Sequence, residues 1–588
     1  MTTELETPSA DAHRNWIENA DVRKLQIGCW IAFIAIALVR AWFTRYAFDG
    51  DSAAYLDIAR AIAEGHPGSA IHAYWSPGYP VLLSFFLWLF HPNVYWECPL
   101  AHFVNLLIFV GTLASFQLFW GELRFWHENY ADDLGTQIPK AAFWALGYSI
   151  FGIAILNIIT VALVGPDMLM AAFCCLAAWS TLRLRRVPSF AGALLLGCIL
   201  ALGYYAKAPL FPMSLVFILC ACFCWPLSRR AVLLGAVALV TFLLVSAPFV
   251  AALSRSKGRL TFGDAARLNY GFFIDGVEHY KHWQGGPPGS GMPVHPTRKL
   301  NDYPEIYEFA AKNIGSYPAW FDPTYWYEGI TPHFELNHQA KFFVAALILE
   351  SQIIMDAGAE LILAAIILAL LASYRWQWTK GVARLWFIWA PGVIGLVMFA
   401  LVHIEPRFLG GWLILVLAGA ICVCSLPASG GTRRGVECVG LAALITVGAA
   451  LTLQASREAV GADHALGRSS HDAAIAEFLL NNGLHPDDDV ALIGYGFEAY
   501  WAHLARLHVV AEIPANIRSN RDHPAFDFWT SGLEQQQKAL RRLERTGVKA
   551  VIADPQNADA GSPPSVVPAP WKKIDETGAY ICFFPARR

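Results

Sequence analysis

The chain has 588 residues, of which 56% are hydrophobic and 15% are charged, and its formal net charge is -3. A high hydrophobic fraction together with few charged residues is typical of a polytopic membrane protein. The near-neutral charge excludes a nucleic-acid partner, because binding to the phosphate backbone requires a strong excess of basic residues.

The first apolar run, residues 27–43, follows a polar segment that ends in Arg23 and Lys24. It lacks a small-residue cleavage site before the acidic loop, so we expect a retained membrane anchor and not a signal peptide. The sequence predicts about eleven transmembrane helices in all. The further apolar runs are residues 101–120, 141–164, 168–182, 190–205, 210–227, 231–253, 357–371, 385–403, 408–426 and 436–453.

Basic residues predict the orientation, because loops rich in Lys and Arg stay in the cytoplasm. They lie in alternate loops, at Arg183, Arg185, Arg186, Arg229, Arg230, Arg375, Lys380, Arg384, Arg433 and Arg434. Residues 1–26 are then a cytoplasmic tail and residues 27–454 the membrane domain. The loops 44–100 and 254–341, and the segment 455–588, are predicted to lie outside.

The first outer loop is predicted to hold two helices at the membrane surface. Residues 51–64 place Tyr55 and Ile58 on one apolar face, with Asp51 as the N-cap. Residues 80–90 are apolar but too short to span comfortably, which indicates an interfacial or re-entrant helix. The loop is therefore expected to form a platform at the outer surface.

Composition changes after Leu453, where the chain becomes charged and soluble in character. The segments "DVALIGYGF", "LHVVAEIP" and "VKAVIADP" read as strands between helical stretches, which predicts a small α/β domain in residues 455–588. Gly494 and Gly496 follow a strand, but a third glycine and an acidic partner are missing, so dinucleotide binding is not indicated.

Five motifs on the predicted outer side carry a resemblance to a known family. They are "GDSAAYLDIARAIAEG", "WSPGYPVLLSFFLWLF", "GPDMLMAAF", "GYYAKAPLFP" and "HIEPRFLGGW", in this order along the chain. Together they resemble the GT-C glycosyltransferases, which depend on polyprenyl-phosphate sugars and include protein O-mannosyltransferases and aminoarabinose transferases. The chain departs from the mannosyltransferase "DE" form, because Ser52 follows Asp51.

The resemblance implies an inverting glycosyltransferase of a bacterial inner membrane, which passes a sugar from a polyprenyl-phosphate carrier to an envelope lipid, glycan or protein. Such transfer needs a base for the acceptor and cations for the departing phosphate. The family's loop aspartate corresponds to Asp51, with Asp49 as the reserve candidate. Asp167 is either a second active-site acid or a helix cap.

Arg407 and Lys207 stand at outer ends of spans, where each could bind the donor phosphate or reach lipid headgroups. Further substrate contacts are predicted at Tyr55, Trp75, His403 and Glu405. The metal requirement stays open between no cofactor and a divalent cation such as Mg²⁺ or Mn²⁺. The alternative function is a membrane transporter or a flippase for lipid-linked sugars, although few polar residues occur deep within the predicted spans.

Overall fold

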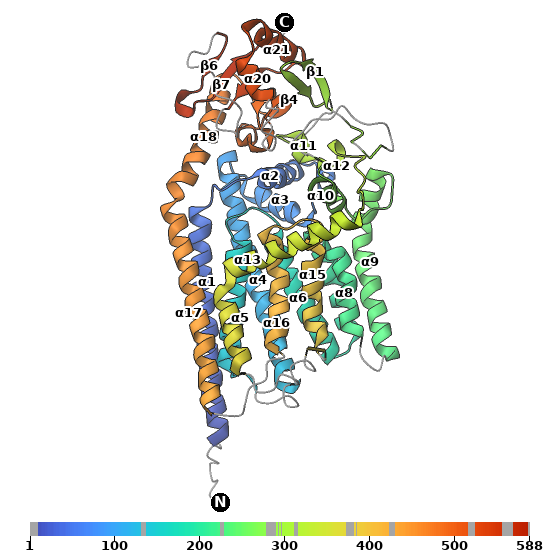
Figure 1. Cartoon of the computed structure of the whole chain (residues 1–588), viewed down its shortest axis with the longest axis vertical. Helices are drawn as coiled ribbons and strands as arrows, with labels where there is room; N and C mark the ends of the chain where they lie inside the picture. Colours follow the sequence, from blue (N-terminus) through green and yellow to red (C-terminus); the bar gives the residue numbers. More distant parts are fainter. Residues whose placement is uncertain are drawn as a thin grey trace, which may run out of the picture.

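The structure is a computed structural model. It describes residues 10–130, 137–223, 228–277, 290–291, 293–295, 297–310, 315–371, 382–383, 385–422, 430–515, 524–554 and 569–585. A bundle of long helices carries a mixed α/β domain at one end, and helix α1 begins at the other end (Figure 1). This arrangement confirms the predicted fold class, a helical membrane protein with a C-terminal α/β domain.

Seven helices of the described residues contain a stretch long and apolar enough to cross a membrane. They are α1 (Ala10–Phe43), α4 (Val94–Tyr130), α5 (Lys140–Phe151) with its π-helical continuation (Gly152–Ile159), α6 (Asp167–Arg186), α9 (Arg229–Lys257), α13 (Leu336–Leu371) and α17 (Gly430–Val460). The shorter apolar helices are α3 (Gly78–Phe90), α7 (Phe190–Ala206), α8 (Leu210–Cys222), α15 (Trp386–Ala400) and α16 (Pro406–Cys422).

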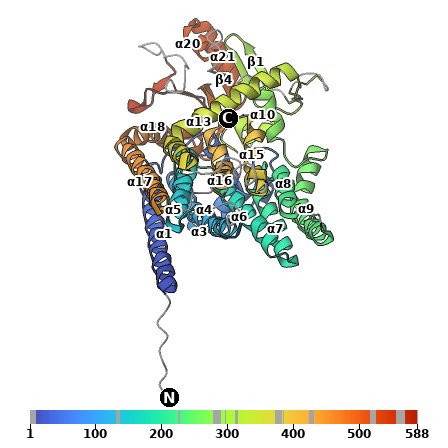
Figure 2. The same ribbon diagram turned by 60° about the horizontal axis from the view of Figure 1, so that its bottom comes forward.

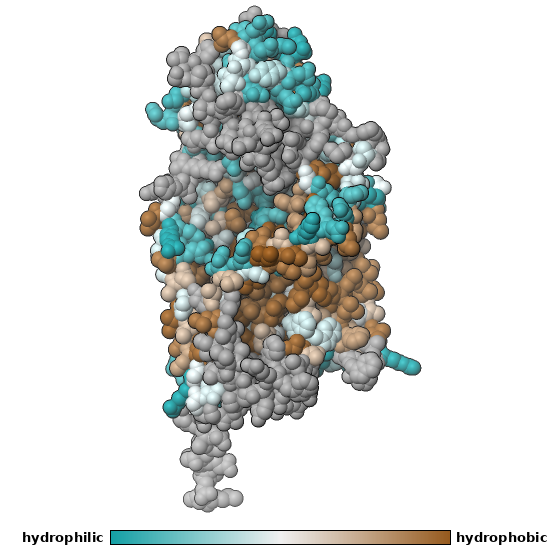
Figure 3. Space-filling model, in the orientation of Figure 1, coloured by the Kyte–Doolittle hydropathy of each residue, from teal (hydrophilic) through white to brown (hydrophobic). Residues whose placement is uncertain are grey.

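Hydrophobic side chains form a broad band across the middle of the molecule, as expected for a surface that faces lipid (Figure 3). The number of crossings stays a prediction, because several apolar helices are shorter than about twenty residues. Arg375, Lys380 and Arg384, which contributed to the predicted orientation, lie outside the described residues.

Helices α1 and α17 lie side by side in both ribbon views (Figures 1 and 2). Arg40 of α1 joins them, because its Nε and Nη2 donate to the carboxylate of Glu458 at 2.8 and 2.6 Å. The Arg40 side chain is only 1% exposed, so this two-pronged pair replaces the water that the guanidinium loses on burial. The first span thus holds the helix that leads into the C-terminal domain.

The first outer loop contains the two predicted helices, α2 (Gly50–Ala63) and α3. Helix α2 buries Tyr55 and Ile58 of the predicted apolar face, and it also buries Leu56. A Cβ atom on Gly78 would lie 2.7 Å from the carbonyl oxygen of Tyr205. Glycine at the start of α3 therefore lets the loop pack directly against the turn between α7 and α8.

The second large loop ends earlier in the structure than the predicted range of residues 254–341. It holds the short helices α10 (Ala265–Phe273), α11 (Pro318–Phe321) and α12 (Pro323–Trp326). Helix α13 then begins at Leu336, within the predicted loop 254–341, and it carries a non-helical kink at Gly358. Its first half packs Phe342 and Ala346 against the adjoining ends of α15 and α16. The predicted span 357–371 is therefore only the second part of a longer helix.

The C-terminal domain is built on a seven-stranded mixed sheet of order β1-β2-β4-β3-β5-β7-β6. Strands β3 (Asp489–Gly494), β4 (His508–Pro514) and β5 (Ala550–Ala553) were predicted from sequence, and they pair in parallel. The remaining elements are α18 (Ala462–Asn481), α19 (Tyr500–Leu504), α20 (Pro524–Thr530), α21 (Leu533–Arg545), β6 (Lys572–Lys573) and β7 (Tyr580–Phe583).

Two strands of this sheet come from the second outer loop, β1 (Arg298–Asp302) and β2 (Glu305–Glu308). Strand β2 pairs antiparallel with β4, with Tyr307 opposite Glu512. The predicted boundary at residue 455 therefore does not enclose the whole sheet. The loop is tied to the C-terminal domain by backbone hydrogen bonds, a long-range pairing that no local pattern reveals.

Candidate active site

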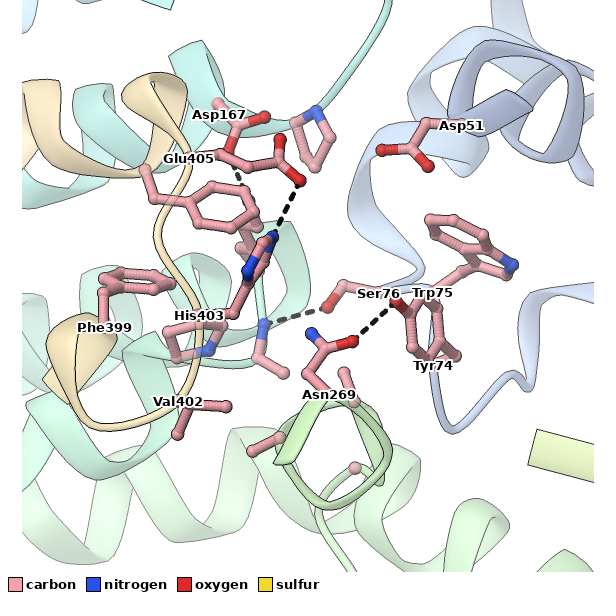
Figure 4. A pocket seen from close by; sticks show the side chains of 18 of the residues that line it. Asp51, Tyr74, Trp75, Ser76, Asp167, Asn269, Phe399, Val402, His403 and Glu405 are labelled. Carbon is pink, nitrogen blue, oxygen red and sulfur yellow. Dashed lines mark hydrogen bonds and ion pairs between the residues drawn. The ribbon is translucent and has the colours of Figure 1, made fainter. Parts of the chain in front are cut away.

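A cavity of about 410 Å³ lies between the first outer loop, α10 and the ends of the membrane helices. It is lined by every predicted site residue except Asp49, and Figure 4 shows several of them converging on one space. The predicted residues at the cavity are Asp51, Tyr55, Trp75, Asp167, Lys207, His403, Glu405 and Arg407. They come from four separate stretches of the chain, so only the fold brings them together.

Asp49 and Asp51 have different places in the structure. Asp49 is the N-cap of α2, because its Oδ1 accepts hydrogen bonds from the backbone N of Ser52 at 2.7 Å and from the Ser52 hydroxyl. The prediction that Asp51 is the cap is therefore wrong. Since Asp49 already satisfies the helix terminus, the carboxylate of Asp51 in the first turn is left to face the cavity.

Arg407 connects the charged groups of the cavity. It lies in the first turn of α16, directly after Pro406. Its Nη2 donates to Asp51 Oδ2 at 2.6 Å, and its Nε donates to Glu405 Oε2 at 2.6 Å. Asp167 Oδ2 lies 3.8 Å from the same Nε atom. One guanidinium thus holds three carboxylates from three segments of the chain.

Lys207 supplies the second cation. It is the C-cap residue of α7, in an extended conformation, and its ammonium donates to Asp167 Oδ1. The ammonium also lies 4.0 Å from the centre of the Phe408 ring, which indicates a cation–π contact. Asp167 is not a helix cap, because Pro166 holds that position, so its carboxylate is engaged by Lys207 and Arg407 instead.

Two of these carboxylates, Asp51 and Glu405, differ in their pKa because their surroundings differ. Burial raises the pKa of Asp51, with further contributions from the charges of Asp49 and Glu405, while Arg407 opposes the rise. Burial acts the same way on Glu405, but hydrogen bonds from His403 and Arg407 outweigh it and lower the pKa to about 2. Asp51 is therefore better suited than Glu405 to accept a proton near neutral pH.

Burial lowers the pKa of Lys207, and the ion pair with Asp167 opposes that effect. Three carboxylates and two cations surround the same space, so the cavity holds a formal excess of one negative charge when His403 is neutral. An anion that enters must therefore displace a carboxylate from a cation, or arrive where one carboxylate is protonated.

His403 lies at the border between the charged and apolar parts of the cavity. Its Nε2 is 3.1 Å from Glu405 Oε1, and its ring stacks on Phe273 of α10 with centroids 3.5 Å apart. The apolar part of the wall comes from α10 and the segment before it, from α15 and the segment after it, and from the start of α8. Its members include Pro209, Pro212, Phe262, Phe272, Phe273, Met398, Phe399 and Val402.

The opposite wall is aromatic and contains residues that the sequence did not single out for the cavity. The ring of Tyr55 packs edge-on against Trp75, at 5.0 Å between centroids, and Trp75 packs similarly against Trp320 at 5.6 Å. The hydroxyl of Tyr74 donates to Asn269 Oδ1 at 2.9 Å, as Figure 4 shows. The amphipathic pattern of α10 was the available signal for Asn269, but it does not reveal what the helix covers.

Among the described residues, no group of three His, Cys, Asp or Glu side chains could hold a metal ion. Glu405 and His403 are close, but their third neighbour is the cation Arg407. Whether the protein requires a divalent cation such as Mg²⁺ or Mn²⁺ stays a prediction.

Comparisons with known proteins agree with the architecture. The fold of the chain is similar to that of a solved structure of ArnT. ArnT from Cupriavidus metallidurans bound to undecaprenyl phosphate aligns with a TM-score of 0.50 at 13% identity, over 94% of this chain and 97% of that chain. The apo structure of the same ArnT aligns with a TM-score of 0.49 at 13% identity, over 90% and 93%. No family model and no curated protein matches the chain.

Proposed function

We propose that the protein is an inverting glycosyltransferase that moves a sugar from a polyprenyl-phosphate carrier to an acceptor at the membrane surface. The observation that carries the proposal is the cavity itself, where the carboxylate of Asp51 and the cations Arg407 and Lys207 face one space. The apolar wall continues from this charged centre. A lipid phosphate has the same two parts, an anionic head and an apolar chain.

The donor phosphate is expected to bind between Lys207 and Arg407. Arg407 presents a planar guanidinium, which suits phosphate oxygens, and Lys207 adds a second point charge. In the free protein Asp51 occupies Nη2 of Arg407 at 2.6 Å. A phosphate that takes this place frees the Asp51 carboxylate, so donor binding and activation of the base are coupled.

The transfer step then follows from the positions of these groups. An acceptor hydroxyl or amine gives its proton to Asp51 while its oxygen or nitrogen attacks the anomeric carbon of the sugar. The bond from that carbon to the phosphate oxygen breaks, and the electron pair leaves with the polyprenyl phosphate. Arg407 and Lys207 stabilise the charge that develops on this leaving group. Attack opposite the phosphate inverts the anomeric configuration.

The sugar itself is expected to lie against the aromatic wall. Trp75 and Trp320 provide ring faces and edges suited to a pyranose, and Asn269 provides a polar group beside them. The Tyr74 hydroxyl engages Asn269 Oδ1. Within the described residues Nδ2 of Asn269 has no acceptor, so this group can donate to a sugar hydroxyl.

The membrane is proposed to be a bacterial plasma membrane, with the cavity and the C-terminal domain on the outer side. The cavity lies at the end of the bundle that carries the C-terminal domain, and Arg186 ends α6 at the other end. In a background lacking accessible cysteines, a cysteine at the exposed Leu260 should react with a membrane-impermeant maleimide in intact cells. A cysteine in place of Arg186 should not react with the same reagent. Labelling at Arg186 but not at Leu260 would show that the orientation is the reverse of the one proposed.

The decisive test of the function uses the purified full-length protein in nanodiscs. It is incubated with a panel of polyprenyl-phosphate sugars and extracts of envelope glycans and lipids, and released polyprenyl phosphate is measured. Release that disappears in Asp51→Asn supports the proposal. No release from any donor, together with flux of a lipid-linked sugar in sealed vesicles, would identify a flippase or transporter instead.

A further inference from the structure

A second cluster of charged side chains lies on another face of α2, where the helix meets the C-terminal domain. Its members are Asp57 and Arg60 of α2, Glu97 of α4, and His503 and Arg506 of the C-terminal domain. Asp57 and Asp51 are six residues apart on one helix, roughly 120° around its axis and about 9 Å along it. The cluster therefore lies beyond the active-site cavity but on the same rigid element.

At the centre of this cluster, both carboxylate oxygens of Asp57 and both ring nitrogens of His503 have polar neighbours within hydrogen-bond distance. His503 Nδ1 lies 2.6 Å from Asp57 Oδ1 and donates to it, since a carboxylate only accepts. Asp57 Oδ2 accepts from the backbone N and the hydroxyl of Ser316, both at 2.7 Å. On the other side of the ring, His503 Nε2 is 3.2 Å from Arg60 Nη2, which also donates to Glu97 Oε2 at 2.5 Å.

The same groups are withdrawn from water. His503 is 1% exposed, Glu97 is 2% exposed and Asp57 is 7% exposed. A buried charge is tolerated when it is paired, and loss of one partner leaves an uncompensated charge in a low dielectric. A shift of the C-terminal domain relative to α2 would therefore be unfavourable, because it would separate these buried charges from their partners. The ring of His503 contacts both neighbours, with Nδ1 donating to Asp57 and Nε2 facing Nη2 of Arg60.

We propose that His503 is a positioning residue for the proposed reaction: it fixes α2 through Asp57 so that Asp51 faces Arg407, which makes the C-terminal domain a part of the catalytic unit. The inference rests on the proposed role of Asp51 as the base. It assigns the domain a specific task, because the contact is made to the helix that carries that base. Arg407 and Lys207 themselves lie on other elements, Arg407 in α16 and Lys207 at the end of α7.

Two substitutions at one position test the proposal. His503→Ala removes both ring nitrogens. His503→Asn places a side-chain amide where Nδ1 lies, so the donor to Asp57 is kept while the titratable ring is lost. The matched control is His471→Ala, since His471 also pairs with a buried aspartate, Asp554, at 3.1 Å, but within the C-terminal domain.

Hydrogen exchange of the α2 amides is the first measurement, because it needs no substrate. We expect exchange in residues 50–63 to become about tenfold faster or more in His503→Ala, and to stay near wild type in His503→Asn and His471→Ala. Helices α4 and α6 should keep their protection in all three variants. Unchanged α2 exchange in His503→Ala, or equal loss in His471→Ala, would overturn the proposal.

Kinetics provide the second measurement. Turnover in His503→Ala should fall about tenfold or more because the base is misplaced, while the donor Kd stays within about twofold. His503→Asn should recover most of the turnover. Equal turnover in the alanine and asparagine variants contradicts a positioning role.

If His503→Ala does not fold, Asp57→Asn tests the same contact from the side of α2, since the aspartate and asparagine side chains have nearly the same volume. The results that would support or overturn the proposal are the same as for His503→Ala. If wild-type protein transfers no sugar from any donor, the proposed function fails, and the exchange data alone decide whether His503 holds α2.

Discussion

Helix α2 carries two aspartates whose surroundings differ in kind. Asp51 faces a cavity of about 410 Å³ and shares Arg407 with Glu405. Asp57 faces His503 and Ser316 in a closed interface where each of its oxygens has a hydrogen-bond donor. The two residues have the same chemistry and lie on one helix. Their difference comes entirely from what the fold places opposite them.

The difference appears in their proton affinities. Burial raises the pKa of Asp51, and Arg407 only partly offsets this. Burial also acts upward on Asp57, but His503, Arg60 and the Ser316 hydrogen bonds outweigh it and lower the pKa to about 2. A carboxylate with a raised pKa beside a cavity is suited to proton transfer. A fully paired carboxylate with a lowered pKa is suited to holding two parts of the protein together.

The largest effect is expected at Asp51. Asp51→Asn keeps the side-chain size but removes the proton acceptor, so turnover should fall about a hundredfold or more while the donor still binds. Turnover and donor affinity are measured on the same purified protein in nanodiscs.

Asp49→Asn is the matched control, two residues away. Asparagine and aspartate are both good N-caps, so turnover should stay within about threefold of wild type. Near-normal turnover in Asp51→Asn would exclude this residue as the base and turn attention to Asp167, which lies beside both cations.

Arg407 should have the next largest effect, on donor binding. Arg407→Gln removes a partly buried, charge-assisted contact to the phosphate, which should weaken the donor by about 2 kcal/mol, or roughly thirtyfold in Kd. Arg186→Gln is the control, since Arg186 pairs with Glu122 at the far end of α6. Unchanged donor affinity in Arg407→Gln would show that Arg407 does not bind the phosphate and only pairs with the carboxylates of the cavity.

A smaller effect is expected at the aromatic wall. Asn269→Ala should lower kcat/KM by about two- to thirteenfold, the range expected for one neutral hydrogen bond of about 0.5–1.5 kcal/mol to the sugar. The loss should disappear for a donor whose sugar lacks the hydroxyl that Asn269 contacts. Asn129→Ala, at an exposed helix end, should be neutral. Equal losses for every donor sugar would place Asn269 in a structural role through Tyr74.

The most subtle effect concerns pH. The charge of Glu405 raises the pKa of Asp51 in the free protein, so Glu405→Gln should lower that pKa and move the acidic limb of the kcat/KM profile to lower pH. Arg407 acts in the opposite direction, so Arg407→Gln should move the limb to higher pH. Profiles of kcat/KM against pH for the two variants and wild type make the comparison. Shifts of the same sign in both variants would show that another group titrates.

Local patterns in the sequence predicted a large part of this protein. The apolar runs indicated the membrane helices, and the alternation of apolar and turn residues indicated strands β3, β4 and β5. The motifs around Asp51, Asp167, Lys207 and Arg407 are recognisable in the sequence, and these four residues line one cavity. Such features are set by residues that are close together in the chain, so they can be predicted from the sequence alone.

Tertiary structure decided the rest, because the relevant contacts join residues far apart in the chain. The spacing indicated Asp51 as the N-cap of α2, whereas in the structure Asp49 holds that position, two residues earlier. The strands β1 and β2 belong to the C-terminal sheet through pairing across about 200 residues, and His503 meets Asp57 across 446. The sequence determined which side chains could do chemistry, and packing decided which aspartate of α2 faces the cavity and which one holds the domain.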